Sequence, residues 1–136
     1  MDDVEAIKRL KARYCRCRDT KDWAGYRQVF ADDVTMDTTE AGGGVVSGAD
    51  EFVASLRRMI GDVVTVHHCH TPEIDITSPT TANGVWAMED MLRWPDGSEL
   101  HGYGHYYETY EKSDGKWRIT SSKLTRLRTD QTPAQP

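Results

Sequence analysis

The hydrophobic residues of this sequence recur with two different periods, and the change falls near residue 62. Before that point apolar residues stand three or four positions apart, as they do on the buried face of an α-helix. The spacing predicts helices over residues 4–17, 23–30 and 48–61. Beyond residue 62 apolar and polar residues alternate, which is typical of β-strands with one buried face. Helices are therefore expected first, and a sheet after them.

The first predicted helix has the clearest pattern. Its apolar stripe consists of Val4, Ile7, Leu10, Tyr14 and Cys17. Asp2 and Glu5 resemble a capping box, in which a side chain ahead of the helix accepts a hydrogen bond from a backbone N–H of the first turn. The third helix has a stripe of its own and ends at Gly61, a residue type that often follows a last helical turn.

The alternating part of the sequence predicts four long strands, at residues 64–77, 82–94, 99–112 and 116–128. Two of the connections contain Asp-Gly, the dipeptide that favours tight hairpin turns. An earlier segment, "DVTMDT", also alternates and predicts a strand. The segment "EAGGGVVSG" is expected to be a loop, and it lacks the Gly-Lys-Ser/Thr ending of a phosphate-binding loop.

Helices followed by connected antiparallel strands indicate an α+β fold. Four long strands joined by short connections should form a curled antiparallel sheet shaped like a cone. The N-terminal helices would cover its concave face and close a deep pocket, the usual place for a ligand. We expect one domain over residues 1–130 and a disordered polar tail over residues 131–136.

Composition and charge narrow the classes of partner. The net charge is −5, whereas a nucleic-acid-binding domain normally presents a basic face. The apolar runs are too short to span a membrane, and the acidic, helical start does not resemble a signal peptide. Three cysteines, an odd number, suit free thiols in a reducing compartment. We therefore expect a cytoplasmic protein without nucleic-acid or membrane partners.

The segment "VTVHHCHTPEID" carries the densest candidate chemistry. In a strand, His67 and Cys69 share one face while His68 and His70 share the other. Neither face offers the three or four adjacent ligands that a zinc site needs, so no metal is predicted, although Asp19 or Asp90 could complete a histidine–carboxylate metal site after folding. Two further interpretations remain open. The histidines are either ordinary surface or packed residues, or one of them is an acid–base group on the pocket wall.

Tyr14 and Asp19 stand five residues apart, where the first predicted helix ends. On a continuous helix they would point about 140° apart, so they can line one pocket only if the helix breaks near Arg18. Asp19 could equally cap the second helix, and Tyr14 could be plain core.

The segment "GYGHYYETYEKSDGKWRI" is aromatic on both faces of its predicted strand. One face carries Tyr106, Glu108 and Tyr110, and the other carries Tyr103, His105 and Tyr107. Such a strand is either a pocket wall or a two-sided aromatic strand of a small core. Further along the chain, Arg126 is either a surface charge or an anion clamp. Aromatic residues on an outer sheet face would also favour a homodimer or higher homo-oligomer.

Three segments carry a resemblance to a known family: "IKRLKARYCRCRDTKDWAGYRQVFADDV", "TVHHCHTPEIDITSPTTANGVWAMED" and "YYETYEKSDGKWRI". The sequence resembles the nuclear transport factor 2-like superfamily, and within it the SnoaL-like branch. That branch includes polyketide cyclases, scytalone dehydratase, bile acid dehydratase and hexachlorocyclohexane dehydrochlorinase. The resemblance runs from Val4 to Asp130 and implies a cone-shaped α+β barrel with an apolar pocket, often dimeric.

The resemblance also implies roles for individual residues. In the lyase members an Asp just after the first helix pairs with a His on the strand that opens "TVH", which here are Asp19 and His67. The bile acid enzyme adds a Tyr and an Arg that fall on Tyr14 and Arg126. The dehydrochlorinase has its Arg nearer Ser122, so the sequence departs from that member.

We therefore expect an acid–base lyase or isomerase, dehydratase- or cyclase-like, that needs neither metal nor cofactor. Its substrate would be a small apolar polycyclic, steroid-like or polyketide-like molecule. His70 would replace His67 as the base if a bulge shifted the strand register. The side chains expected to bind substrate are His70, Asp90, His105, Glu108 and Ser122. The alternative is a non-catalytic protein of the same fold that binds a small ligand.

Overall fold

The computed structural model describes residues 1–134, and its secondary structure follows the predicted order. The N-terminal elements are α1 (Asp3–Asp19), α2 (Trp23–Arg27), β1 (Phe30–Asp37), the 3-10 turn η1 (Thr39–Ala41), β2 (Val45–Ser47) and α3 (Ala49–Ile60). The remaining elements are the long strands β3 (Val64–Ser78), β4 (Thr81–Arg93), β5 (Glu99–Ser113) and β6 (Lys116–Thr132). The α+β class predicted from the change of period is confirmed. Only η1 and β2 were not expected, because their segment reads as a glycine-rich loop.

Helix α1 is fixed at its start by the predicted cap. The Asp2 carboxylate accepts a hydrogen bond from the Glu5 backbone N–H at 2.8 Å, which satisfies one of the free donors of the first turn. The helix then runs without a break through Arg18 to Asp19. Tyr14 and Asp19 therefore point in different directions, and the helix break that would have brought them to one pocket does not occur.

The six strands form one sheet in the order β2-β1-β6-β5-β4-β3. Strands β3 to β6 pair antiparallel, as predicted. Strand β1 pairs parallel with β6, with Phe30 opposite Ile119, so the sheet is mixed rather than wholly antiparallel. The parallel pair arises because the chain passes through β2, α3 and three more strands before β6 returns beside β1.

The hairpin turns use the predicted residues. Asp114 and Gly115 both have positive φ, 52° and 73°, the backbone of the tight turn that matches the twist of two strands. Gly97 in the turn between β4 and β5 has φ 86°. Strand β6 continues to Thr132, so two residues of the tail predicted at 131–136 belong to it. Residues 135 and 136 lie outside the described part.

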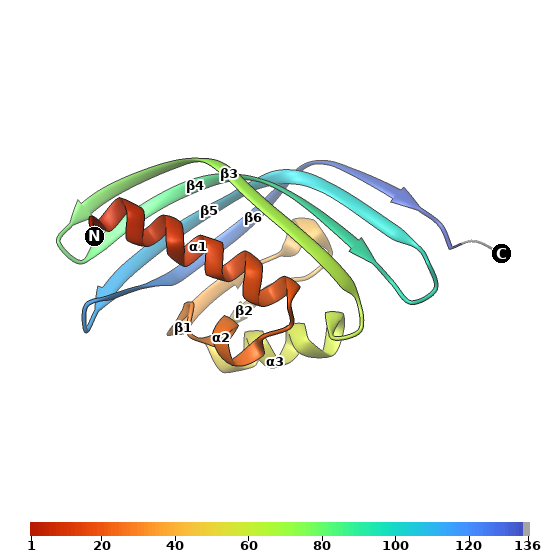
Figure 1. The fold of residues 1–136 in the computed structure, drawn as a ribbon, viewed down its shortest axis with the longest axis horizontal. Helices are drawn as coiled ribbons and strands as arrows, with labels where there is room; N and C mark the ends of the chain where they lie inside the picture. Colours follow the sequence, from red (N-terminus) through yellow and green to blue (C-terminus); the bar gives the residue numbers. More distant parts are fainter. Residues whose placement is uncertain (135–136) are drawn as a thin grey trace.

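The long strands curve together over α1, which lies along their concave side, while α2 and α3 lie beside β1 and β2 (Figure 1). The inner face of the sheet and the inner stripes of the helices share one core. Its fully buried large members include Ile7, Leu10, Tyr14, Tyr26, Phe30, Met36, Tyr110 and Ile119. The sheet is curled but not closed, and α1 and α3 cover the open side. No helix in the described residues is long and apolar enough to span a bilayer.

Candidate active site

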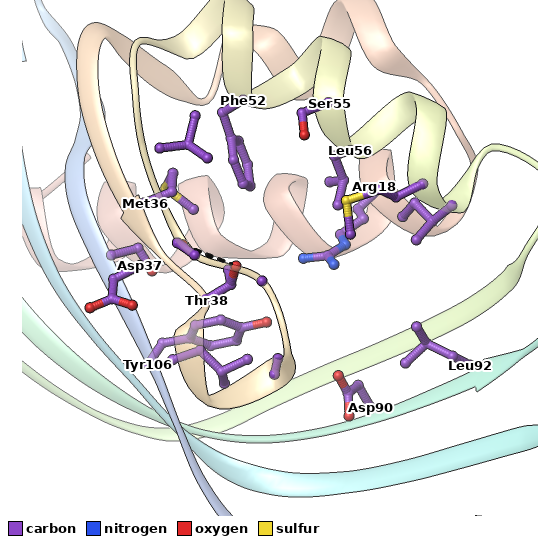
Figure 2. A pocket seen from close by; sticks show the side chains of 18 of the residues that line it. Arg18, Met36, Asp37, Thr38, Phe52, Ser55, Leu56, Asp90, Leu92 and Tyr106 are labelled. Carbon is purple, nitrogen blue, oxygen red and sulfur yellow. Dashed lines mark hydrogen bonds between the residues drawn. The ribbon is translucent and has the colours of Figure 1, made fainter.

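A cavity of about 280 Å³ lies between α1, α3 and the inner face of the sheet. Its wall is mostly apolar. Figure 2 shows Phe52 and Leu56 of α3 facing Leu92 and Asp90 of β4, with the Arg18 side chain reaching into the space between them. The other polar or charged side chains of the wall include Tyr14, Asp37, Thr38, Ser55, Tyr106, Ser122 and Arg126. The cavity therefore combines an apolar body with polar groups that come from α1, from α3 and from the sheet and its connections.

Asp19, the last residue of α1, reaches across to β3 and contacts His67. Its Oδ1 lies 2.7 Å from His67 Nδ1, and its Oδ2 accepts the His67 backbone N–H at 2.7 Å. The Thr65 hydroxyl donates to the same carboxylate at 2.9 Å. Three contacts from one strand hold this carboxylate, so the orientation of the imidazole is fixed.

The protonation states follow from this geometry. A carboxylate only accepts hydrogen bonds, so the proton of the neutral imidazole sits on Nδ1 and the lone pair on Nε2. Burial lowers the pKa of His67, and the positive charge of Arg18 acts in the same direction against Asp19 and Asp90. Burial alone would raise the pKa of Asp19, but the hydrogen bonds from His67 and Thr65 outweigh it and lower that pKa. Near neutral pH the pair is a carboxylate beside a neutral imidazole.

Asp90 and Arg126 form a second pair on the adjoining wall. The Arg126 guanidinium donates to both oxygens of the buried Asp90 carboxylate, at 2.9 and 3.1 Å. Gly102 on β5 lies directly beneath this pair, and a Cβ there would collide with both side chains. Asp90 also lies opposite His67 in the sheet, with its Oδ2 3.8 Å from His67 Nε2. Arg126 is thus held rigidly by two bonds, and Asp90 links it to the histidine.

Arg18 and Tyr14 provide a third polar group. One N–H of the Arg18 guanidinium donates to the Tyr14 hydroxyl at 2.9 Å, and that hydroxyl lies 3.4 Å from the Tyr106 hydroxyl. Burial raises the pKa of Tyr14 despite the neighbouring guanidinium, so the phenol stays protonated. A protonated phenol next to a fixed cation can donate to an oxygen that gains negative charge.

Three of the four buried unpaired polar atoms in the described part of the chain belong to residues of the cavity wall or to a residue next to it. Within residues 1–134, the buried side-chain nitrogen or oxygen atoms without a hydrogen-bond partner are Arg18 Nε, Tyr26 Oη, His67 Nε2 and Arg126 Nε. Buried polar atoms are normally paired, so each exception requires an explanation. Two of the residues, Arg18 and Arg126, line the cavity, and the third, His67, lies directly behind Asp90.

A separate buried network lies deeper, between α1 and the sheet. Lys11 and Glu108 form an ion pair at 2.8 Å, with side chains 1% and 0% exposed. The Tyr110 and Ser122 hydroxyls each donate to the Glu108 carboxylate at 2.8 Å. Ser122 also lines the cavity, so it is the point where this network reaches the site.

The predicted site residues are therefore brought together only in part. Tyr14, Asp90, Ser122 and Arg126 line the cavity. His67 and Asp19 contact each other as predicted but do not themselves form the cavity wall, because α1 continues to Asp19 and directs its carboxylate toward β3. The remaining predicted residues occupy other places.

Glu108 is buried beneath the wall and holds Lys11. His70 is exposed on β3, because the bulge in that strand begins after it and leaves the register at His67 regular. His105 lies on the outer face with Tyr103 and Tyr107, which are 36% and 48% exposed. Strand alternation places His105 opposite the cavity, so neither histidine is positioned to bind a ligand there.

Two basic residues were missed by the sequence reasoning. Arg18 lines the cavity and Lys11 is almost fully buried, although basic residues usually lie on the solvated side of a helix. The signal was present, since Lys11 precedes Tyr14 by three positions and Arg18 follows it by four. Residues at those separations share a helix face, so both belong to the buried stripe of α1.

Comparisons with known proteins agree with this architecture. A family model described as a SnoaL-like domain matches residues 1–123. A Gibberella zeae protein named probable cyclase FGR4 is 25% identical over 137 residues, covering 89% of each chain. A Novosphingobium aromaticivorans structure, provisionally called scytalone dehydratase, matches with a TM-score of 0.86 and 23% identity over 98% of this chain and 89% of its own.

A structure of hexachlorocyclohexane dehydrochlorinase type 2 matches with a TM-score of 0.85 and 16% identity, covering 97% of this chain and 90% of its own. The two structures show that the fold is shared, and the family model spans most of the sequence. The chain belongs to the SnoaL-like family, within the nuclear transport factor 2-like fold.

Proposed function

We propose that the protein is a lyase or isomerase that moves protons on a small apolar substrate, without a cofactor, through the Asp19–His67 dyad. The observation that carries this proposal is that two residues of an apolar cavity wall, Arg18 and Arg126, each keep an unpaired Nε, while the unpaired His67 Nε2 lies 3.8 Å from the wall residue Asp90. Unpaired donors beside an unpaired base suit a substrate with an acidic carbon next to a carbonyl oxygen. The apolar wall would hold the rest of that substrate.

His67 is the base of the proposed reaction. Its Nε2 lone pair accepts a proton from the carbon next to the carbonyl, and the electron pair of that bond moves to the oxygen. Asp19 holds the ring and stabilises the imidazolium that forms, at a contact of 2.7 Å. A base of this kind contributes roughly 10²–10⁴-fold to a rate.

The negative charge that develops on the substrate oxygen is stabilised by three residues, Arg126, Arg18 and Tyr14. All three line the cavity, and both guanidinium groups retain an unpaired N–H. Donors that are already in place need not reorganise during the reaction, which makes them effective. The bidentate bond of Arg126 to Asp90 keeps its guanidinium in position.

The product of this proton transfer is an enolate, which can react further in two ways. If the neighbouring carbon carries a hydroxyl, that group leaves as a double bond forms, takes the proton from the His67 imidazolium and departs as water. If it carries none, the same proton returns to a different carbon, which is an isomerisation. Both reactions balance without any other reagent, and the geometry suits either.

His67 Nε2 is covered in this state and lies 3.8 Å from the Asp90 carboxylate. Substrate binding therefore has to rotate Asp90 away from the imidazole. A ligand oxygen on Arg126 would favour that rotation, because it would replace one of the two bonds that now hold Asp90. Catalytic contacts that form fully only with substrate are common in such sites.

The volume of about 280 Å³ lies near the lower end of ligand cavities, which run from roughly 300 to 1,000 Å³. This supports a substrate of one to three rings more than a four-ring steroid. The names of the relatives, a cyclase, a dehydratase and a dehydrochlorinase, support proton abstraction from carbon as the shared chemistry.

Proton abstraction can be measured before the natural substrate is known. The protein is incubated in D₂O with small cyclic ketones and hydroxy-ketones, and exchange of the protons next to the carbonyl is followed by NMR. We expect catalysed exchange that falls at least about 10²-fold in Asp19→Asn and in His67→Gln. The double variant should lose little more than either single one, because the pair acts as a unit.

His68→Gln is the matched control, since this exposed neighbour on β3 points away from the dyad. If His67→Gln exchanges as fast as the unchanged protein, the dyad is not the base. A compound that binds in the cavity and perturbs Arg18 and Arg126 signals, with neither exchange nor turnover, would instead favour a ligand-binding protein.

A further inference from the structure

Cys15 of α1 and Cys69 of β3 face each other where these two elements lie side by side (Figure 1). Their sulfur atoms are 3.5 Å apart, and both thiols are free and partly exposed. They do not line the cavity of the proposed active site. They border a second, surface depression, which is also lined by Lys11, His67 and His70. The proposed acid–base chemistry uses neither thiol.

The two thiols have different reactivities. The hydrogen bond with Cys69 lowers the pKa of Cys15. The charge of Lys11, one helical turn earlier, acts in the same direction, against burial and the carboxylates of Asp19 and Glu108. The same hydrogen bond, together with burial, raises the pKa of Cys69. Thiolates are the reactive form of cysteine, so Cys15 would react first and Cys69 second.

We propose that Cys15 and Cys69 are a site of reversible oxidation, at which a hydroperoxide converts the two thiols into an intramolecular disulfide between α1 and β3. The Cys15 thiolate attacks the peroxide O–O bond and becomes a sulfenic acid, while the alcohol or water derived from the peroxide leaves. Cys69 then attacks the sulfenic sulfur, the S–O bond breaks and water is released. Two thiols are oxidised and one hydroperoxide is reduced.

The geometry needs only a small adjustment. A disulfide bond is about 2.05 Å long, so the sulfur atoms must approach each other by roughly 1.5 Å, a distance that two side-chain rotations can share. Cys15 lies one turn before Asp19 on the same helix, and Cys69 lies two residues after His67 on the same face of β3. The cross-link would therefore join the two elements that carry the proposed dyad and leave both of its residues in place.

Cys17 provides an internal control. It is buried, and its sulfur lies 3.9 Å from a carboxylate oxygen of Asp22. Burial and that carboxylate raise its pKa, so it should react slowly. The protein thus contains a reactive pair of thiols and, two residues from Cys15, a third thiol that should react slowly.

The test treats the reduced protein with one equivalent of hydrogen peroxide and then blocks the remaining thiols with N-ethylmaleimide under denaturing conditions. Intact mass should show a monomer that has lost two hydrogens and carries one maleimide, and peptide mapping should place a disulfide between Cys15 and Cys69. Dithiothreitol should reverse the change. The melting temperature of the oxidised form should rise by several degrees, since the bond closes a long loop.

Cys17→Ser should still form the disulfide, whereas Cys15→Ser and Cys69→Ser should not. Cys15→Ser should also consume peroxide at least about tenfold more slowly than Cys69→Ser, because it lacks the thiol whose pKa is lowered. Three alkylated thiols after peroxide, disulfides only between molecules, or equal loss of both thiols to sulfinic acid would each overturn the proposal. These readouts are masses and thiol counts, so they do not depend on the proposed enzymatic activity.

Discussion

The buried Lys11–Glu108 pair allows a sharp test of how the interior of this protein is stabilised. Lys11→Met keeps the length of the side chain and removes its charge. The ammonium contacts Glu108 at 2.8 Å and lies 3.6 and 3.8 Å from the ring centres of Tyr14 and Tyr106. The substitution therefore leaves the Glu108 carboxylate in the core with only its two hydroxyl donors, from Tyr110 and Ser122.

Removing one partner of a buried ion pair typically costs about 3–5 kcal/mol, because the other charge stays buried without compensation. For 136 residues the entropy of unfolding is about 0.29 kcal/mol per kelvin, at roughly 2.1 cal/mol/K per residue. The melting temperature should therefore fall by about 10–17 °C. Loss of the two cation–π contacts would add to the effect, by roughly 0.5–1 kcal/mol each or more.

The assay is a double-mutant cycle, with urea unfolding followed by circular dichroism for Lys11→Met, Glu108→Met and the double variant. The double variant should be more stable than the sum of the single losses predicts, by at least about 2 kcal/mol, because no lone charge remains. Arg9→Met is the control, since its pair with Glu5 is exposed and should contribute less than about 1 kcal/mol. Additive losses, or a Lys11→Met cost below about 1 kcal/mol, would refute the reasoning.

Three further predictions concern the site and the assembly. Gly102→Ala should displace the ends of the Arg126 and Asp90 side chains and reduce activity at least about tenfold. It should cost less stability than Gly104→Ala, whose Cβ meets a backbone carbonyl; melting curves and the exchange assay separate the two variants. Because the pKa of His67 is lowered in the folded protein, the unfolded chain binds a proton there that the folded chain does not. The free energy of unfolding should therefore decrease as pH falls below about 6.5. Arg18→Met should weaken that decrease, since the charge of Arg18 helps to lower this pKa. We also predict a homodimer that forms through the outer face of the sheet, where Tyr103, Val64 and Val66 are exposed. Light scattering that gives a 15 kDa particle at micromolar concentration would contradict this prediction.

The period of the sequence predicts the helices and the four long strands to within a few residues, because burial of one face fixes each pattern. The pairing of strands is harder to predict than the positions of the strands along the sequence. The alternation of Val34 and Met36 shows that β1 is a strand, but it carries no information that β1 pairs parallel with β6. That pairing depends on how the whole chain returns, which no local pattern records.

The site shows the same division. Strand alternation places His67 and His68 on opposite faces of β3, and the resemblance joins His67 to Asp19. Neither indicates that Asp90 stands between His67 and the cavity, because their contact depends on the register of β3 with β4. Arg18 was overlooked for another reason: a basic residue near a helix end is usually solvated, and only its spacing from Tyr14 places it inside.

The parallel pairing of β1 with β6 has a consequence for the order in which the chain folds. Phe30 cannot acquire its partner Ile119 until residues 116–132 have formed a strand, so the contact spans about two thirds of the sequence. Contacts between residues far apart in the sequence slow folding, because a long loop must close before they form. During that interval β1 has only the three-residue β2 beside it, and its other edge is open to strands from other molecules. Slow refolding with aggregation that depends on protein concentration is therefore the expected kinetic signature of this topology.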